Sequence, residues 1–161
     1  MLPMTTVTLR PRTAAEFDEW QDALAEDYAA EQVAAGRWPY EGAVRRARDE
    51  SARLLPQGPA TERMLVNLAV DADGEPVGRS WVALDPPHAT AGIAFLYDIE
   101  VVESRRGQGL GRALLTATED AARRAGATAL ELNVFGRNAA AVALYDSAGY
   151  AVVTQQMRKP L

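Results

Sequence analysis

The sequence predicts an α/β fold, of the α+β type, built as a single domain over residues 1–161. A strand pattern, a helix pattern and another strand pattern follow one another between residues 93 and 134, which predicts a right-handed parallel crossover. Two earlier strand patterns flank Asp71-Ala-Asp-Gly74, a tight turn that predicts an antiparallel hairpin. The chain has 161 residues, 48% of them hydrophobic, which is enough for one full core.

The first third of the chain predicts one short strand and two helices. Residues 6–10 alternate as a strand does. Thr13 and Glu16 form a capping box, after which apolar residues follow at helical spacing, namely Phe17, Trp20, Leu24 and Tyr28. Residues 36–39 break this helix, and a second, more polar helix is expected over residues 40–55.

The remainder alternates strands and helices. Strands are predicted over residues 64–70, 77–84, 93–101 and 129–134. Helices are predicted over residues 109–125 and 138–148, ended by Gly126 and Gly149. Residues 150–157 form a final extended segment.

Composition excludes several kinds of chemistry. The chain has no cysteine, so it forms no disulfide, no thiolate metal site and no cysteine acyl-enzyme, and it fits a reducing cytoplasm. Its one histidine, His88, follows two prolines in an expected loop and lies outside any serine–histidine–aspartate signature. A net charge of −5 argues against nucleic acid and favours cationic ligands, and no apolar run approaches a membrane span of about 18 residues. We predict no metal site, nucleic-acid partner or membrane contact.

A glycine-rich segment lies between a predicted strand and a predicted helix. In residues 105–112 (RRGQGLGR), residues without side chains let backbone N–H groups approach an anion closely. The N-terminus of the helix adds about half a positive charge. Arg106 and Arg112 can add charge-assisted contacts to a phosphate. The segment predicts a phosphate or pyrophosphate site, and the alternative is a turn that only allows tight packing.

Two common nucleotide motifs fit this segment poorly. A P-loop needs a lysine that is missing here, and a dinucleotide fingerprint needs Gly-x-Gly-x-x-Gly. Read from Gly109, that pattern meets Leu114 where it needs glycine, although Glu131 lies about where a ribose-binding acid would fall. Too little chain follows for a doubly wound domain, so dinucleotide binding is a minor alternative.

The same segment resembles the acyl-CoA loop of the GNAT superfamily of acetyl-CoA-dependent N-acetyltransferases. That loop has the pattern Gln/Arg-x-x-Gly-x-Gly/Ala, which residues 106–111 match in full. Residues 97–102 resemble the family's fourth strand, and residues 132–150 resemble its second motif. The detailed match covers about residues 93–150, and the other elements agree in order. The resemblance implies a GNAT-like fold, with a central mixed, mostly antiparallel twisted sheet that splays near its middle and helices on both faces.

The sequence departs from the family in two places. Glu103 stands where the family often has proline. The family usually ends with two antiparallel strands, whereas only about a dozen residues follow Gly149 here. The last hairpin is then shortened, fused into one long strand, or completed by a second subunit. A homodimer is a family-level expectation.

The resemblance implies how acetyl-CoA is held as the acyl donor. The pyrophosphate contacts the loop residues Arg106, Gly107, Gln108, Gly109, Leu110, Gly111 and Arg112. The backbone from Ile99 to Val101 pairs with the pantetheine arm as an added strand would, and the Val101 N–H polarises the thioester carbonyl. Such a donor is worth about 3 kcal/mol in the transition state. Asn138 is expected to cap the last helix and, by resemblance, to lie near the CoA arm.

Three residues are candidates for catalysis. By resemblance Tyr145 protonates the leaving thiolate; the alternative is a core residue, because Tyr145 also lies on an apolar helix face. Asp98 and Glu100 alternate on a strand, so they share one face, and their mutual repulsion suits a general base. We expect Glu100 to be the base and Asp98 to anchor the amine. The alternative is that both face solvent or pair with arginines.

These residues favour an N-acetyltransferase that moves an acetyl group directly from acetyl-CoA to an amine in a ternary complex. The acceptor is a small-molecule or peptide amine. The resemblance places its pocket near residues 28–40, with Glu31, Trp38 and Tyr40 as candidates; both aromatic residues are also explained as core. The alternative function is a non-catalytic acyl-CoA-binding module of the same fold.

Overall fold

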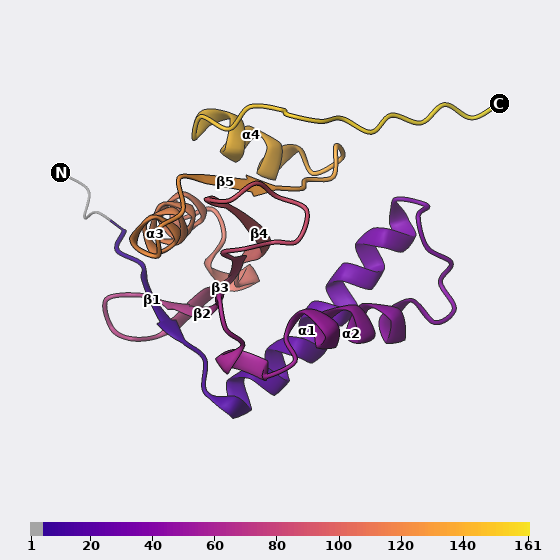
Figure 1. Cartoon of the computed structure of the whole chain (residues 1–161). Helices are drawn as coiled ribbons and strands as arrows, with labels where there is room; N and C mark the ends of the chain where they lie inside the picture. The colour runs from indigo at the N-terminus through magenta and orange to yellow at the C-terminus, as the bar shows by residue number, and fades with distance from the viewer. Residues whose placement is uncertain (1–4) are drawn as a thin grey trace.

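A computed structural model describes residues 5–161 and shows one mixed sheet with helices packed against it (Figure 1). Its strand order is β1-β2-β3-β4-β5. The strands are β1 (Thr8–Pro11), β2 (Met64–Val70), β3 (Pro76–Ala83), β4 (Ile93–Val101) and β5 (Ala129–Leu132). The first four pair antiparallel and β5 pairs parallel to β4. The predicted mixed, mostly antiparallel sheet is therefore confirmed.

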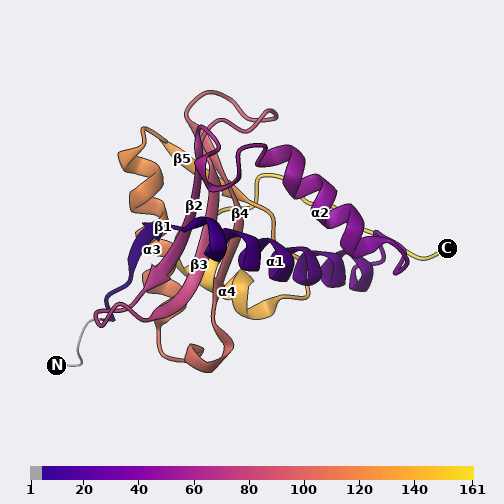
Figure 2. The ribbon, with the colours of Figure 1, turned by 90° about the horizontal axis from the view of Figure 1, so that it is seen from below.

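The helices divide between the two faces of the sheet. They are α1 (Ala14–Ala34), α2 (Ala43–Leu54), α3 (Leu110–Arg124) and α4 (Ala139–Ser147), with short 3-10 turns at Gly58–Ala60 and Glu103–Arg105. Figure 2 shows α1 and α2 on one side of the strands and α3 on the other. Phe17, Trp20 and Leu24 of α1 pack with Val66 and Trp81. The opposite face packs under α3, through Leu110 and Leu114.

Helix boundaries follow the capping signals in the sequence. The Glu16 N–H donates to Thr13 Oγ1 at 3.3 Å, and the Thr13 N–H donates to Glu16 Oε2 at 2.9 Å, so the predicted capping box forms. Helix α2 begins at Ala43, three residues later than expected, because Gly42 adopts a left-handed φ of 77° as its N-cap.

The sheet opens between β4 and β5. The two strands pair only from Ile93 opposite Ala129 to Leu96 opposite Leu132. A bulge follows at once on the other side of β4, because Val82 pairs with Leu96 while its neighbour Trp81 pairs with Asp98. Residues 97–101 therefore pair with β3 along one edge only, which is the splay that the resemblance implied.

The C-terminal segment does not join the sheet. Among residues 5–161 no strand follows β5, and residues 151–161 run outward past α4 (Figure 1). Val152, Val153 and Met157 are 79%, 75% and 84% exposed. Of the expected arrangements, neither a shortened hairpin nor one long strand forms within the chain, because β5 is only four residues long and offers a short edge.

Within residues 5–161, no helix has the length and apolar character that crossing a membrane would require.

Candidate active site

The glycine loop joins the end of β4 to the start of α3. Gly107 and Gly109 adopt φ values of 74° and 77°, in the left-handed region. A Cβ added at either residue would meet nothing within 4 Å, so glycine is needed for the backbone conformation and not for space. Gly109 is the N-cap of α3 and makes no side-chain capping bond. The N–H groups of the first turn are thus left to bind an anion.

The unpaired edge of β4 leads directly into this loop. The Val102 N–H donates to Val77 O at 2.9 Å, toward β3. Since backbone polar groups of successive residues point to opposite edges, those of Ile99 and Val101 point to the open side. Arg106 confirms this direction, because its Nε donates to Val101 O at 3.2 Å. A long ligand can therefore pair along this edge with an anionic end at the loop.

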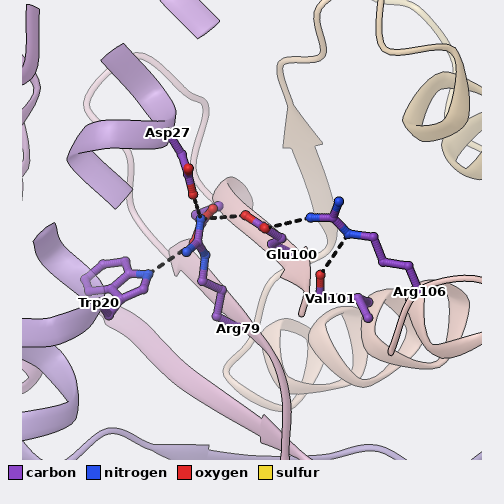
Figure 3. Close-up of polar contacts among 7 residues, drawn as sticks. Trp20, Asp27, Arg79, Glu100, Val101 and Arg106 are labelled. Carbon is purple, nitrogen blue, oxygen red and sulfur yellow. Dashed lines mark hydrogen bonds and ion pairs between the residues drawn. The ribbon is translucent and has the colours of Figure 1, made fainter. Parts of the chain in front are cut away.

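A partly buried arginine lies at the centre of the face of β4 that looks toward α1 (Figure 3). The side chain of Arg79, 14% exposed, ion-pairs with three carboxylates. Its Nε lies 2.9 Å from Asp98 Oδ2, and its Nη2 lies 2.9 Å from Asp27 Oδ2 and 2.7 Å from Glu100 Oε2. Among residues 5–161 no group of three or more acidic or histidine side chains is arranged to hold a metal ion. The guanidinium of Arg79 lies between the carboxylates of Asp27, Asp98 and Glu100 and supplies the positive charge there.

The two predicted acids share one face, as their alternation predicted, but their surroundings differ. Asp98 is 10% exposed and accepts a hydrogen bond from Trp20 Nε1 at 3.2 Å. Burial raises the pKa of Asp98, and Arg79 opposes that shift. Glu100 is 35% exposed and bridges two arginines, with Oε1 lying 2.9 Å from Arg106 Nη2. Both acids thus pair with arginines, the alternative that the sequence left open.

Tyr145 lies on the other side of the splay, on α4. Its half-buried ring meets Tyr150 edge-on, with centroids 5.5 Å apart. Burial raises the pKa of Tyr145, and the charge of Asp98 adds to the shift, so the phenol keeps its proton at neutral pH. Asn138 caps α4 as predicted, because its Oδ1 accepts from the Ala141 N–H at 3.2 Å.

Other predicted loop residues are held in place by neighbours. Arg112 donates to Ser147 Oγ and so ties the start of α3 to α4. Gln108 Oε1 accepts from Arg105 Nε at 3.3 Å, and Arg105 Nη1 in turn pairs with Asp71 at 3.0 Å. The loop is therefore anchored on both sides, and the guanidinium of Arg112 points toward α4.

Only one of the three candidate acceptor residues lies near the acids. Partial burial raises the pKa of Glu31; the charge of Arg137 opposes that shift, and those of Asp27, Asp98 and Glu100 add to it. Trp38 is 9% exposed, with the Arg46 guanidinium 4.3 Å from its ring centroid and Tyr28 edge-on to it, so it belongs to the core. Tyr40 is 89% exposed and does not line the pocket that lies beside the acids, between α1 and the sheet.

A pocket of about 370 Å³ lies between α1 and the sheet, beside this network. Trp20, Arg79, Glu100 and Arg12 contribute to its walls. No sequence pattern had indicated four of the residues here as site residues, namely Trp20, Asp27, Arg79 and Arg12. An arginine within the mostly apolar strand of residues 77–84 was the one available signal.

Comparisons with known proteins agree with this geometry. A sequence profile described as the Acetyltransferase (GNAT) family matches residues 17–150. The chain is 32% identical over 155 residues to the uncharacterized N-acetyltransferase YdgE of Bacillus subtilis (strain 168), a match that covers 96% of this chain and 98% of YdgE. The crystal structure of YycN from Bacillus subtilis, 32% identical, covers 97% of this chain and 99% of that chain with a TM-score of 0.90.

A more distant structure shares the fold. AAC(6')-Iy, 16% identical, aligns with a TM-score of 0.63 over 96% of this chain and 97% of its own, and it was solved with the bisubstrate analog CoA-S-monomethyl-acetylneamine. The family profile and the full-length relatives, together with the splayed strand and its glycine loop, show that this chain belongs to the GNAT family of acetyltransferases.

Proposed function

We propose that this protein transfers an acetyl group from acetyl-CoA directly to an amine within a ternary complex. One observation carries the proposal: the open edge of β4 over residues 97–101 runs straight into a glycine loop at the N-terminus of α3. That arrangement offers a row of backbone groups to an extended arm and a cluster of N–H donors to a pyrophosphate.

The cofactor residues act mainly through their backbone. The loop from Arg106 to Gly111 gathers N–H groups around the pyrophosphate, and the Arg106 side chain can add a charge-assisted contact to it. Ile99 and Val101 pair with the pantetheine arm through groups on the open edge. The Val101 N–H polarises the thioester carbonyl, a donor worth about 3 kcal/mol in the transition state.

The acids and the tyrosine handle protons. An alkylammonium has a reference pKa of about 10, so the acceptor must lose a proton before it attacks. Glu100, the more exposed acid, is the proposed base, acting directly or through water, and Asp98 is the proposed anchor for the amine. Tyr145 keeps its proton until the thiolate leaves and then donates it, while Asn138 holds the start of α4.

The acceptor is proposed to be a small-molecule amine. The pocket beside Glu100, about 370 Å³, is in the lower part of the range for small ligands. A relative named aminoglycoside N(6')-acetyltransferase type 1, from Klebsiella aerogenes, is 33% identical over 129 residues, which supports an amine as acceptor. The exposed Val152, Val153 and Met157 support a homodimer in which a partner covers them.

A non-catalytic acyl-CoA-binding module is the second candidate. The pairing of both acids with arginines favours it, because Glu100 is engaged by Arg79 and Arg106 in this structure. The two candidates bind the same cofactor and differ in turnover.

The cofactor is tested by thermal unfolding with acetyl-CoA, CoA, NADH or ATP added separately. A ligand at about 100 times its dissociation constant adds about 2.7 kcal/mol of stability. We expect acetyl-CoA and CoA alone to raise the melting temperature. No shift with either would refute the proposal, and a shift with NADH alone would mean a dinucleotide site.

Turnover is tested by thiol release from acetyl-CoA with a panel of amines, in the wild type and in Tyr145→Phe. General acids contribute about 10²- to 10⁴-fold, so we expect kcat to fall at least about 100-fold while CoA still raises the melting temperature. An unchanged kcat would remove Tyr145 from the mechanism. CoA binding without turnover of any amine would favour the binding module.

A further inference from the structure

Arg12, just after β1, is a cation without a carboxylate partner. Its Nη1 donates to the backbone oxygen of Glu16 at 3.2 Å, and its guanidinium lies 5.4 Å from the ring centroid of Trp20. Its Nε is buried and has no hydrogen-bond acceptor in the described part of the chain. Among residues 5–161 it is in no ion pair, so most of its donors are free to bind a ligand.

The acids around Arg12 are committed elsewhere. Both carboxylate oxygens of Glu16 bind Arg10, at 2.7 and 2.9 Å. Asp98 pairs with Arg79, and Glu100 pairs with Arg79 and Arg106. Burial lowers the pKa of Arg12, repulsion from Arg79 adds to that shift, and the charges of Asp98 and Glu16 oppose only part of it. A partly buried charge with incomplete compensation is costly, so this position is best explained by an anionic group that a ligand supplies.

The pocket beside Arg12 gives that ligand a place. Arg12, Trp20, Leu68, Pro76 and Glu100 all line the same cavity of about 370 Å³. A single small molecule in it can therefore touch both Arg12 and Glu100. Glu19, an exposed residue, also lines it and adds negative charge on the helix side. The charged side chains that line the pocket are two arginines, Arg12 and Arg79, and three glutamates, Glu16, Glu19 and Glu100. A ligand that contacts residues of both kinds carries both signs of charge.

We propose that the acceptor is a small amine that bears a carboxylate, as amino acids do, and that Arg12 binds this carboxylate while the amine lies toward Glu100. The planar fork of a guanidinium matches a carboxylate with two parallel hydrogen bonds. This assignment of Arg12 to the acceptor carboxylate rests on the proposed acetyltransferase function. It names the chemical class of the acceptor, which the proposed function left open. It makes Arg12 the residue that determines acceptor specificity.

Matched acceptors test the assignment. Each L-amino acid is compared with its own carboxamide by kcat/KM for thiol release. The carboxamide has the more easily deprotonated amine, so chemistry alone favours it. We expect the wild type to prefer the best free acid by about 10- to 100-fold, and Arg12→Gln to lose that preference while its affinity for CoA is unchanged. Arg45→Gln, which removes an exposed charge outside the pocket, is the control and keeps the preference.

A second readout does not depend on turnover. The Nε–H signal of Arg12 in a ¹⁵N correlation spectrum is assigned by its absence in Arg12→Lys, which keeps the charge and loses the fork. We expect at least one amino acid to shift it where its carboxamide does not. If Arg12→Gln fails to fold, Arg12→Lys replaces it in the kinetic comparison and loses the preference as well.

Three outcomes would overturn the assignment. One is that no free acid shifts the Arg12 signal more than its carboxamide does. Another is that Arg12→Gln slows the free acid and the carboxamide equally. The third is that neamine, a polyamine without a carboxylate, is a better acceptor than every amino acid. Because CoA binding is measured separately, each of these is distinguishable from failure of the proposed transferase.

Discussion

The two sides of β4 form a site in different ways. On the proposed cofactor side, the open strand edge and the glycine loop belong to one stretch of chain, residues 97–112, and they present mainly backbone groups. On the proposed acceptor side, side chains from α1, β3 and β4 meet around Arg79. The first side therefore depends on backbone conformation, and the second depends on charges that compensate one another across long separations in sequence.

This difference has energetic consequences. Backbone donors at a helix N-terminus exist as soon as the loop adopts its conformation, so most substitutions that keep the glycines leave them in place. Buried charges are stable only while their partners remain, because removal of one partner leaves the others desolvated and unpaired. Mutation should thus separate the two sides, with stability lost on the acceptor side and ligand affinity lost on the cofactor side.

The largest effect is expected for Arg79→Met. This change removes the cation that Asp27, Asp98 and Glu100 share, and it leaves only Glu100 with an arginine partner, Arg106. The Arg79–Asp98 pair is 14% and 10% exposed, and breaking a pair so little exposed costs about 3–5 kcal/mol, measured as the free energy of unfolding in urea at pH 7. Asp27 and Glu100 are 57% and 35% exposed, so their pairs with Arg79 contribute less. Arg48→Met is the control, because the Arg48–Asp22 pair is 53% and 69% exposed and should contribute less than about 1 kcal/mol.

Acidic pH should partly rescue Arg79→Met. Without the guanidinium, the carboxylates repel one another, so protonating them relieves the repulsion. The stability gap to the wild type is therefore expected to narrow as the pH falls from 7 toward 5. A loss that stays constant over this range would show that Arg79 stabilises the fold by packing alone, and the charge argument would fail.

An intermediate effect is expected on the cofactor side for Gly109→Val. Gly109 has φ of 77°, and a side chain in this left-handed region costs about 1–2 kcal/mol, with more for a β-branched residue. Affinity for CoA, measured by titration calorimetry, should fall about tenfold or more. Gly136→Val is the matched control, because Gly136 is not in the left-handed region and an added Cβ there meets nothing within 4 Å. Equal losses in both variants would contradict a conformational role.

The difference between a site formed by one segment and a site formed by distant segments also explains which features could be predicted from the sequence. The glycine loop was predictable because its residues are consecutive and its chemistry is local. The strands at Met64–Val70 and Ile93–Val101 were predicted with their observed bounds, since period-two patterns are local too. Asp27 and Arg79 lie 52 residues apart, and only folding brings them to 2.9 Å, so no spacing rule could pair them. The sequence also left open whether Trp38 lies in the acceptor site or in the core. Its contacts with Arg46 and Tyr28, which place it in the core, cannot be read from the spacing of residues.

The smallest effect concerns an ion pair at the rim of the acceptor side. The Arg10 guanidinium and the capping contacts of Thr13 lower the pKa of Glu16 to about 2, from an ordinary value of 4.5. Because the folded-state pKa is the lower one, the stabilisation is present above about pH 4.5 and is lost as the pH falls toward 2. Glu16→Gln keeps a capping-box side chain and removes the charge. Its melting temperature should be slightly below that of the wild type at pH 7, and the gap should close as the pH falls from about 4.5 toward 2. A gap that persists at the lowest pH would assign the contribution of Glu16 to its neutral hydrogen bonds rather than to the pair with Arg10.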